Sequence, residues 1–238
     1  TAYHTQFPDY VAARTGANPE WIWRYIRWFH APAQGILAST PTIEAVLAAH
    51  GLAQVRRWGR GVSAEFRPHG RLDAMIAALP RPIMLYVGRV AVEKNVAAFL
   101  SADHPGSKVV IGDGPARAAL ETRYPGAHFL GARFGDDLAA AYRTADVLVF
   151  PSRTDTFGLV MIEAMACGTP VAAHPVTGPL DVLTPESGAM REDLAEAVAA
   201  ALALDPRACA ETGARHGWRA SAEQFLAALA PLPVPLAA

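Results

Sequence analysis

From residue 83 onward, short apolar runs alternate with glycine or proline loops and with longer apolar segments of helical character. The runs occupy residues 83–87, 108–111, 128–130, 147–150 and 170–173. Helical segments are expected between and after them, at about residues 94–102, 115–123, 135–144, 158–167, 192–204 and 218–229. Short apolar strands that alternate with helices predict an α/β fold with a parallel, doubly wound sheet.

The loops that follow these strands are rich in glycine. Gly88, Gly112 and Gly131 each come directly after an apolar run, and Pro151 follows the fourth run. In an open parallel sheet, ligands bind outside the carboxyl ends of the strands. Glycine at such a position lets backbone N–H groups approach a ligand closely. Several loops of this kind on one edge of the sheet predict a binding crevice there.

The residues before this repeat contain fewer elements. A helix is expected over residues 18–30, because Asn18 is a good N-cap and Pro19 suits the first helical position. A strand near 36–39, a helix from 40 to 49 and a strand near 55–58 follow. The glycines at 59 and 61 interrupt the pattern, as a linker does. We therefore expect one domain over residues 1–61 and a second over 62–238.

Composition excludes several classes of protein. The formal net charge is -1, so general binding of nucleic acid is not expected. The two cysteines make no disulfide framework, and we find neither a signal peptide nor an apolar run long enough to span a bilayer. No histidine spacing suggests a metal site. These features indicate a cytoplasmic protein. Because the chain begins at Thr1 without a methionine, we also expect that an N-terminal part is missing.

Two carboxylates accompany the expected helix at 158–167. Glu163 is the one charge in this apolar helix, and Asp155 lies just before it. A buried carboxylate is costly unless a partner compensates it, and the free N–H groups at a helix start favour an anion. An anion site flanked by two carboxylates suits a sugar diphosphate. The alternative is structural: Asp155 caps the helix and Glu163 pairs with an arginine of the core.

The segment from Asp155 to Pro170 resembles the E-x7-E signature of family 4 glycosyltransferases, the retaining enzymes with the GT-B fold. The resemblance implies that Asp155 binds hydroxyls of the donor sugar and that Glu163 binds the ribose. The usual first acid is glutamate, so aspartate at 155 leaves the identity of the sugar open. The backbone at Phe157, Gly158 and Leu159 is expected to border the sugar and the phosphates.

A second segment, residues 88–95, resembles the G-R-x4-K-N motif of the same family. The resemblance implies that Arg89 and Lys94 hold the diphosphate, which agrees with the ability of two fixed cations to neutralise leaving phosphate charge. Arg133 lies where relatives read the base with backbone atoms, although a plain surface charge is the alternative. The remaining site residues expected from the resemblance are His4, Gly88, Asn95, Gly112, Asp113, Gly114 and Ala132, with His4 facing the donor sugar from the first domain.

The resemblance implies a GT-B architecture of two Rossmann-like domains with parallel sheets, the first one incomplete. It covers nearly the whole chain and is closest to GDP-mannose-dependent α-mannosyltransferases and sulfoquinovosyl-diacylglycerol synthases. We expect a metal-independent, retaining hexosyltransferase that uses GDP-mannose, needs no cofactor and acts on a lipid or glycan acceptor. The alternatives are a UDP-sugar-dependent glycolipid synthase and a donor-binding fragment without activity.

The helix at 18–30 raises the hypothesis of peripheral membrane contact. At about 3.6 residues per turn, Trp21, Tyr25 and Trp28 share one stripe, and Arg24 and Arg27 lie beside each other. Aromatic rings with arginines suit the headgroup layer of a membrane. Because aromatics occur around the whole helix, the alternative is a helix buried between two layers of the protein.

Overall fold

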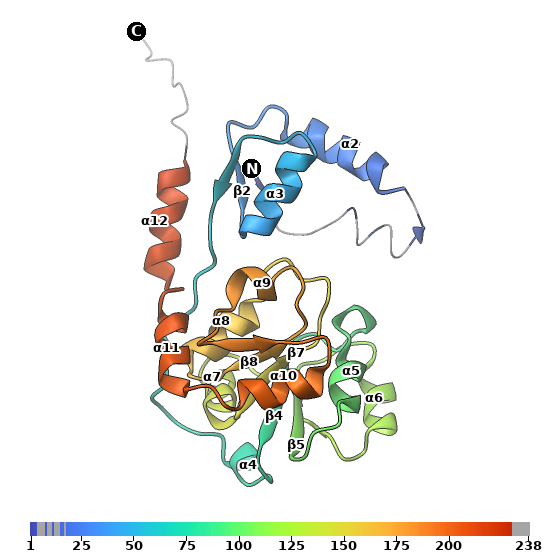
Figure 1. The fold of residues 1–238 in the computed structure, drawn as a ribbon, viewed down its shortest axis with the longest axis vertical. Coiled ribbons are helices and arrows are strands. Elements are labelled where there is room, and N and C mark those ends of the chain that lie inside the picture. The colour runs from blue at the N-terminus through green and yellow to red at the C-terminus, as the bar shows by residue number, and fades with distance from the viewer. Residues whose placement is uncertain (4–7, 9–10, 12–14, 17, 230–238) are drawn as a thin grey trace. The chain divides into compact units, whose positions relative to one another are not determined.

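The computed structural model of the chain describes residues 1–3, 8, 11, 15–16 and 18–229. The chain divides into two compact units (Figure 1). One unit comprises residues 1–61 together with the residues from Trp218 onward, and the other comprises Val62–Gly217.

The first unit contains a parallel three-stranded sheet in the order β1-β2-β3, with β1 at Ala2–Tyr3, β2 at Ile36–Ala38 and β3 at Val55–Arg57. Helix α2 spans Pro19–His30 and helix α3 spans Pro41–Ala49. Both helices begin at their expected caps. The Asn18 side chain accepts a hydrogen bond from the Glu20 N–H (2.9 Å), and Thr40 caps α3 through the Ile43 N–H (3.4 Å). The expected helices and strands of this unit are confirmed.

Helix α12, Trp218–Ala228, groups with the first unit and not with the second. The Trp58 indole N–H donates to the Ser221 hydroxyl (3.1 Å), and the Gly59 N–H donates to the Gln224 side chain (2.8 Å). The Arg56 guanidinium donates to the carbonyl of Ala228, the last residue of the helix (2.7 Å). These bonds attach α12 to the segment around β3, so the second unit ends before the expected limit at residue 238.

The second unit contains a fully parallel six-stranded sheet in the order β6-β5-β4-β7-β8-β9. Its strands are β4 (Ile83–Val87), β5 (Ser107–Ile111), β6 (His128–Phe129), β7 (Val147–Phe150), β8 (Val171–Ala173) and β9 (Gly188–Met190). The chain builds the sheet outward from β4 in one direction, then crosses back to β7 and builds in the other direction. This strand order is that of a doubly wound, Rossmann-like sheet, as expected.

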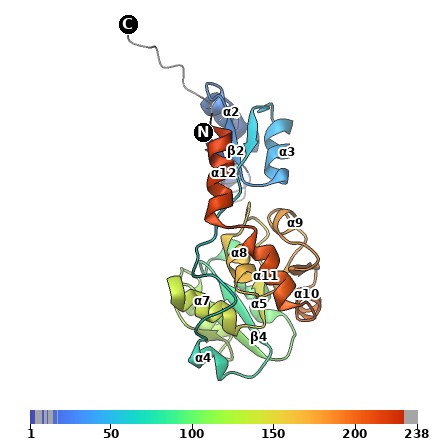
Figure 2. The same cartoon turned by 90° about the vertical axis from the view of Figure 1, so that its left-hand side faces the viewer.

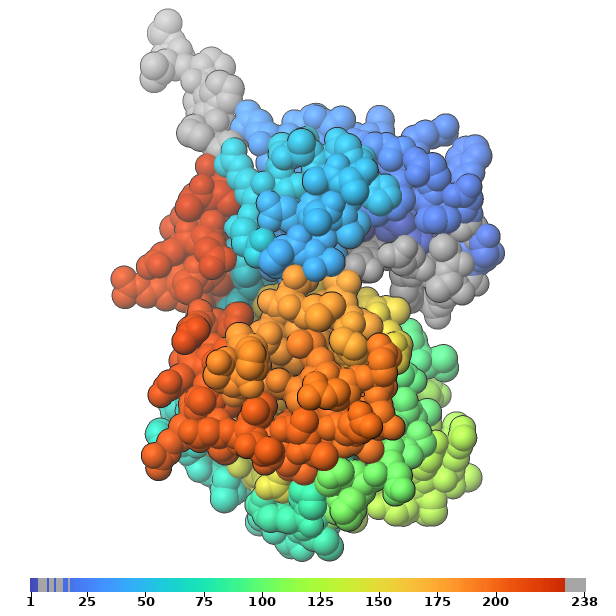
Figure 3. All heavy atoms as spheres, viewed as in Figure 1, coloured from blue at the N-terminus to red at the C-terminus, as the bar shows by residue number. Residues whose placement is uncertain are grey.

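Alternate residues of each strand face opposite layers of helices. Ile83 and Leu85 face one core with α4 (Ala74–Ala77), α7 (Gly135–Thr144), α8 (Leu159–Ala166) and α11 (Pro206–Ala214). Met84 and Tyr86 face the other core with α5 (Val96–Ser101), α6 (Arg117–Arg123) and α10 (Leu194–Ala201). In the space-filling view, the orange segment of α10 and the green segment of α5 and α6 lie on this second face (Figure 3). Hydrophobic layers on both faces explain why nearly every strand residue is apolar.

Five elements of the second unit were not expected from the sequence: α4, a single 3-10 turn at Val92–Lys94, α9 (Pro179–Val182), β9 and α11. Of these, α11 has the largest role, because it packs closely against α8 (Figure 2). A Cβ atom at Gly213 would overlap the backbone N of Ala166, so only glycine permits this approach of the two helices.

Candidate functional site

The sheet of the second unit changes its direction of growth between β4 and β7. In a doubly wound sheet the ligand crevice lies at this point, outside the carboxyl ends of the two strands. The loops that leave β4 and β7 contact each other there. The Lys94 ammonium lies 2.5 Å from the Asp155 carboxylate, and the Asn95 side-chain amide donates to the Pro151 carbonyl (3.2 Å). Residues from the two family-like motifs therefore converge at one place.

Glycines hold the neighbouring loops close together at the same edge. Gly112 (φ 136°) and Gly114 (φ 157°) both have positive φ, and a Cβ atom at either would overlap a backbone carbonyl, of Gly88 and Val90 respectively. The Gly112 N–H donates to the Gly131 carbonyl (2.8 Å). The predicted glycine loops after β4, β5 and β6 are therefore one packed layer of backbone, and side chains at 112 and 114 would force it apart.

The two cations expected at the diphosphate both have acidic partners. Arg89 lies 3.2 Å from Glu93 and Lys94 lies 2.5 Å from Asp155. Tyr86, at the end of β4, donates its hydroxyl hydrogen to the Arg89 carbonyl (2.8 Å). Burial, and then the charges of Asp155 and Glu93, raise the pKa of Tyr86 well above its usual range. The carboxylates of Asp155 and Glu93 therefore both lie near the buried Tyr86 hydroxyl. Together with Arg89 and Lys94 they form one cluster of charges.

Helix α8 begins beside this cluster. Gly158 precedes it with φ 80°, in the left-handed region that favours glycine, and Gly168 follows it with φ 81°. The Phe157 side chain is buried in the core, so its backbone is the part that can border a ligand. Gly178, from the loop after β8, lies so close that a Cβ atom there would come within 2.7 Å of the Asp155 carbonyl. The backbone around Asp155 therefore packs directly against the loop after β8.

Glu163 lies on the second turn of α8, and its partner is a tyrosine. The fully buried Tyr142 donates its hydroxyl hydrogen to the Glu163 carboxylate (2.9 Å). Burial raises the pKa of Glu163, and the charge of Glu65 adds to the rise, while the Tyr142 hydrogen bond opposes it. The alternative of a glutamate paired with a core arginine is wrong. One neutral donor leaves capacity on the carboxylate for further hydrogen bonds.

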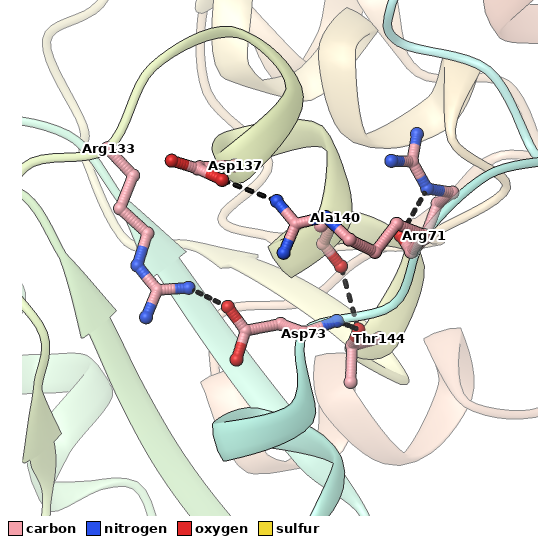
Figure 4. Close-up of polar contacts among 7 residues, drawn as sticks. Arg71, Asp73, Arg133, Asp137, Ala140 and Thr144 are labelled. Carbon is pink, nitrogen blue, oxygen red and sulfur yellow. Dashed lines mark hydrogen bonds and ion pairs between the residues drawn. The ribbon is translucent and has the colours of Figure 1, made fainter.

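Arg133 is not a plain surface charge. Its guanidinium pairs with the Asp73 carboxylate, and the two side chains are only 16% and 11% exposed (Figure 4). Asp73 caps α4 through the Ile76 N–H (3.0 Å), and its own N–H donates to the Thr144 hydroxyl of α7 (2.8 Å). The Arg133 side chain thus fastens α4 to the loop after β6. Base recognition by the backbone at Ala132 and Arg133 stays a prediction.

The structure distributes the remaining expected residues as follows. Asp113 contacts Arg117 of α6 (3.5 Å) and accepts a hydrogen bond from the Gly114 N–H (2.7 Å). Leu159 opens α8 and is half exposed. His4 lies outside the described residues. Sequence reasoning missed Tyr142 and Glu93, the partners of Glu163 and Arg89. A single aromatic residue after three alanines was the available signal for Tyr142.

Comparisons with known proteins agree with this geometry. The family described as glycosyl transferases group 1 matches residues 81–204, just over half of the chain. The chain belongs to this family. It is 38% identical to a GDP-mannose-dependent alpha-mannosyltransferase of Mycobacterium tuberculosis (strain CDC 1551 / Oshkosh), over 77% of this chain and 50% of the relative. It is 36% identical to sulfoquinovosyl transferase SQD2 of Arabidopsis thaliana, over 76% of this chain and 39% of the relative.

Solved structures agree with the family. Sucrose-phosphate synthase from Thermosynechococcus elongatus superimposes with a TM-score of 0.74 at 28% identity, over 95% of this chain and 65% of that protein. The chain has the GT-B glycosyltransferase fold, as expected. It spans about half the length of the curated group 1 relatives that it matches. Within the described residues, no cluster of three or more His, Cys, Asp or Glu side chains has the arrangement of a metal site. Metal independence itself stays a prediction.

Proposed function

We propose that this chain is the donor-binding half of an anomer-retaining hexosyltransferase that moves mannose from GDP-mannose to an acceptor hydroxyl of a lipid or glycan. The observation that carries the proposal is the contact of Lys94 with Asp155 at the switch point of the sheet (2.5 Å). A cation for phosphate and a carboxylate for sugar hydroxyls stand side by side there, next to the start of α8. The names of the mycobacterial relatives support GDP-mannose as the donor.

The residues divide the chemistry as follows. The bond from the anomeric carbon to the diphosphate oxygen breaks, and a bond from that carbon to the acceptor oxygen forms on the same face. Arg89, Lys94 and the first N–H groups of α8 stabilise the charge on the leaving nucleoside diphosphate. The acceptor proton passes to an oxygen of the leaving phosphate, so no base from the protein is required. Glu163 holds the ribose and Asp155 holds sugar hydroxyls.

Thermal protection by nucleotides tests the proposal. The chain is heated with GDP, GDP-mannose, UDP or UDP-glucose, each with and without EDTA. A ligand at about 100 times its Kd stabilises the folded state by about 2.7 kcal/mol, which is a rise in Tm of about 5–10 °C for a unit of this size. We expect the largest rise with GDP-mannose and no effect of EDTA.

Other outcomes identify the alternatives. Protection by UDP-sugars alone favours a UDP-sugar-dependent glycolipid synthase, in line with the similarity to sulfoquinovosyl transferase SQD2. Protection by GDP-mannose without transfer to any acceptor favours a donor-binding fragment. Absence of protection by all four nucleotides would refute the proposal.

We further propose peripheral contact with an anionic membrane through α2. One face of this helix, with Trp23 and Ile26, is buried in the first unit. The opposite face is aromatic and open: Trp21, Tyr25 and Trp28 are 67%, 60% and 70% exposed. Within the described residues this face is largely uncovered, which favours membrane contact over a helix buried between two layers of the protein. In the described part of the chain no helix has the length and hydrophobicity needed to cross a bilayer.

Arg24 is the cation of α2 that favours anionic lipids, since Arg27 is paired with Glu20 of the same helix. The Arg24 guanidinium lies over the Trp21 ring (4.9 Å from its centroid), where it can reach lipid phosphates beside an inserted ring. Sedimentation with vesicles that contain phosphatidylglycerol tests this contact. We expect pelleting at low salt that is lost when Trp21 and Trp28 are both changed to alanine. Pelleting that is indifferent to these changes would exclude α2 as the contact.

A further inference from the structure

Both cations assigned to the diphosphate are ion-paired with carboxylates of the protein itself. Lys94 contacts Asp155 at 2.5 Å across the gap between two loops, and Arg89 contacts Glu93 at 3.2 Å within one loop. The side chains of Lys94 and Asp155 are only 28% and 23% exposed. An ion pair of this exposure is less screened by solvent than a surface pair. A diphosphate that enters this site must therefore compete with carboxylates for its cations.

The backbone that carries Asp155 packs closely against neighbouring loops. Gly178 packs against the Asp155 carbonyl, where even a Cβ atom would come within 2.7 Å. The Asn95 side chain joins the two loops through the Pro151 carbonyl (3.2 Å). Side-chain rotation of Asp155 or Lys94 separates the pair without moving either loop. A phosphate held by Lys94 therefore lies close to a negative charge, unless that carboxylate finds new hydrogen-bond donors.

We propose, on the basis of the proposed function, that Asp155 is an internal competitor of the nucleoside diphosphate. In the free protein its carboxylate holds Lys94. A sugar nucleotide supplies hydroxyl groups that hold this carboxylate when the diphosphate takes over Lys94. After transfer the sugar is gone, the carboxylate loses those donors and returns to Lys94, and the nucleoside diphosphate is displaced. Asp155 thus sets the preference of the site for the sugar nucleotide over the free nucleoside diphosphate.

The proposal differs from a positioning role for Asp155. If the carboxylate merely held Lys94 in place for phosphate, its neutralisation would weaken the binding of GDP and GDP-mannose alike. If the carboxylate competes, its neutralisation strengthens the binding of GDP and removes the preference for GDP-mannose over GDP. The ratio of the two dissociation constants separates these mechanisms, because loss of the fold or of the whole site changes both constants in the same direction.

The experiment measures the Kd of GDP and of GDP-mannose by isothermal titration calorimetry on the whole chain. The variants are Asp155→Asn, Asp155→Glu, Glu93→Gln and Asp146→Asn. Glu93→Gln removes the other paired carboxylate, which has no assigned contact with sugar. Asp146 pairs with Arg81 at the amino end of β7, so Asp146→Asn controls for the loss of one charge at the opposite edge of the sheet.

We expect Asp155→Asn to bind GDP about fivefold more tightly, the upper range for partly exposed ion pairs. We expect the preference for GDP-mannose over GDP to fall at least about tenfold, because hydrogen bonds from sugar hydroxyls to a charged acceptor are lost. Glu93→Gln should lower the Kd of GDP and of GDP-mannose by the same factor and so keep the ratio of the two constants. Asp155→Glu should restore the weak binding of GDP, and Asp146→Asn should match the unchanged protein.

Equal or weaker binding of GDP by a folded Asp155→Asn variant would overturn the proposal. A variant that does not fold is replaced by Asp155→Ser, judged by the same ratio. If the unchanged chain prefers UDP, the same titrations with UDP and UDP-glucose apply with the same expected ratios. If it binds no nucleoside diphosphate at all, the proposed function fails and this inference with it. Normal binding with an unaltered ratio contradicts the inference alone.

Discussion

Replacement of Glu163 by alanine should lower both stability and donor affinity, because the carboxylate takes part in two separate interactions. The change removes the acceptor of the fully buried Tyr142 hydroxyl (2.9 Å). A buried donor without a partner costs about 1–3 kcal/mol, or a fall in Tm of about 2–12 °C for a unit of 150–250 residues. The change also removes the proposed acceptor of the ribose hydroxyls. Loss of a charged hydrogen bond of about 1.5–3 kcal/mol weakens the binding of GDP about 10- to 150-fold.

Two matched variants separate these effects. Tyr142→Phe removes the buried donor but keeps the carboxylate, so we expect a lower Tm with GDP affinity within a few fold. Glu163→Gln keeps an acceptor for Tyr142 and removes the charge. Burial raises the pKa of Glu163, so the ionised acid opposes folding once the pH is above that pKa. Glutamine should therefore match or exceed the original Tm at neutral pH while binding GDP weakly.

Calorimetry with GDP and thermal unfolding followed by circular dichroism measure both quantities. Normal GDP affinity in a folded Glu163→Ala protein would refute the ribose assignment. Equal losses of GDP affinity in Tyr142→Phe and Glu163→Ala would show that the carboxylate acts only through the structure of α8.

Three other predictions concern the same unit. Arg89→Ala and Lys94→Ala should each slow sugar transfer strongly while lowering Tm only slightly. Unchanged rates in both variants would contradict their assignment to the diphosphate. Gly213→Ala should lower stability by about 1–3 kcal/mol in urea unfolding, because its Cβ would overlap the backbone of α8, whereas Gly126→Ala, with open space around it, should change little. Burial and a neighbouring arginine lower the pKa of His216. Its contribution to stability is therefore present above pH of about 6.5 and lost as the pH falls through its lower folded value. His216→Asn should reduce the fall in Tm between pH 7.5 and 5.5, and an unchanged fall would remove this residue from the account.

The doubly wound sheet was predictable because its strands are buried on both faces. Residues 83–87 and 147–150 are continuous apolar runs, and both form strands with the predicted limits. The glycines after β4 and β5 were equally informative, since positive φ at Gly88 and Gly112 leaves almost no other residue suitable. Local chemistry thus determined these elements, and the fold class followed from their order.

The missed elements are those whose formation depends on tertiary contacts. Strand β9, Gly188–Met190, contains no β-branched residue and pairs only because β8 lies beside it. Helix α11 does carry a start signal, since Asp205 caps it through the Arg207 N–H (2.9 Å) and Pro206 follows. Its interior Gly213 weakens the pattern, because glycine lowers helix propensity. The close approach to α8 that requires this glycine is invisible in the sequence.

The candidate site shows the same division between local and tertiary information. Lys94 and Asp155 are 61 positions apart, and each was assigned from its own motif. Their pairing depends on the adjacency of β4 and β7, which are neighbours in the sheet but not in the sequence. A motif assigns each residue to phosphate or to sugar separately, whereas the strand order makes them partners of each other. In the free site the Asp155 carboxylate therefore pairs with Lys94, the cation that is assigned to the diphosphate of the substrate. The free energy of donor binding is then the difference between the site with donor bound and the free site in which Asp155 is paired with Lys94. A substitution of Asp155 changes the free energy of both states.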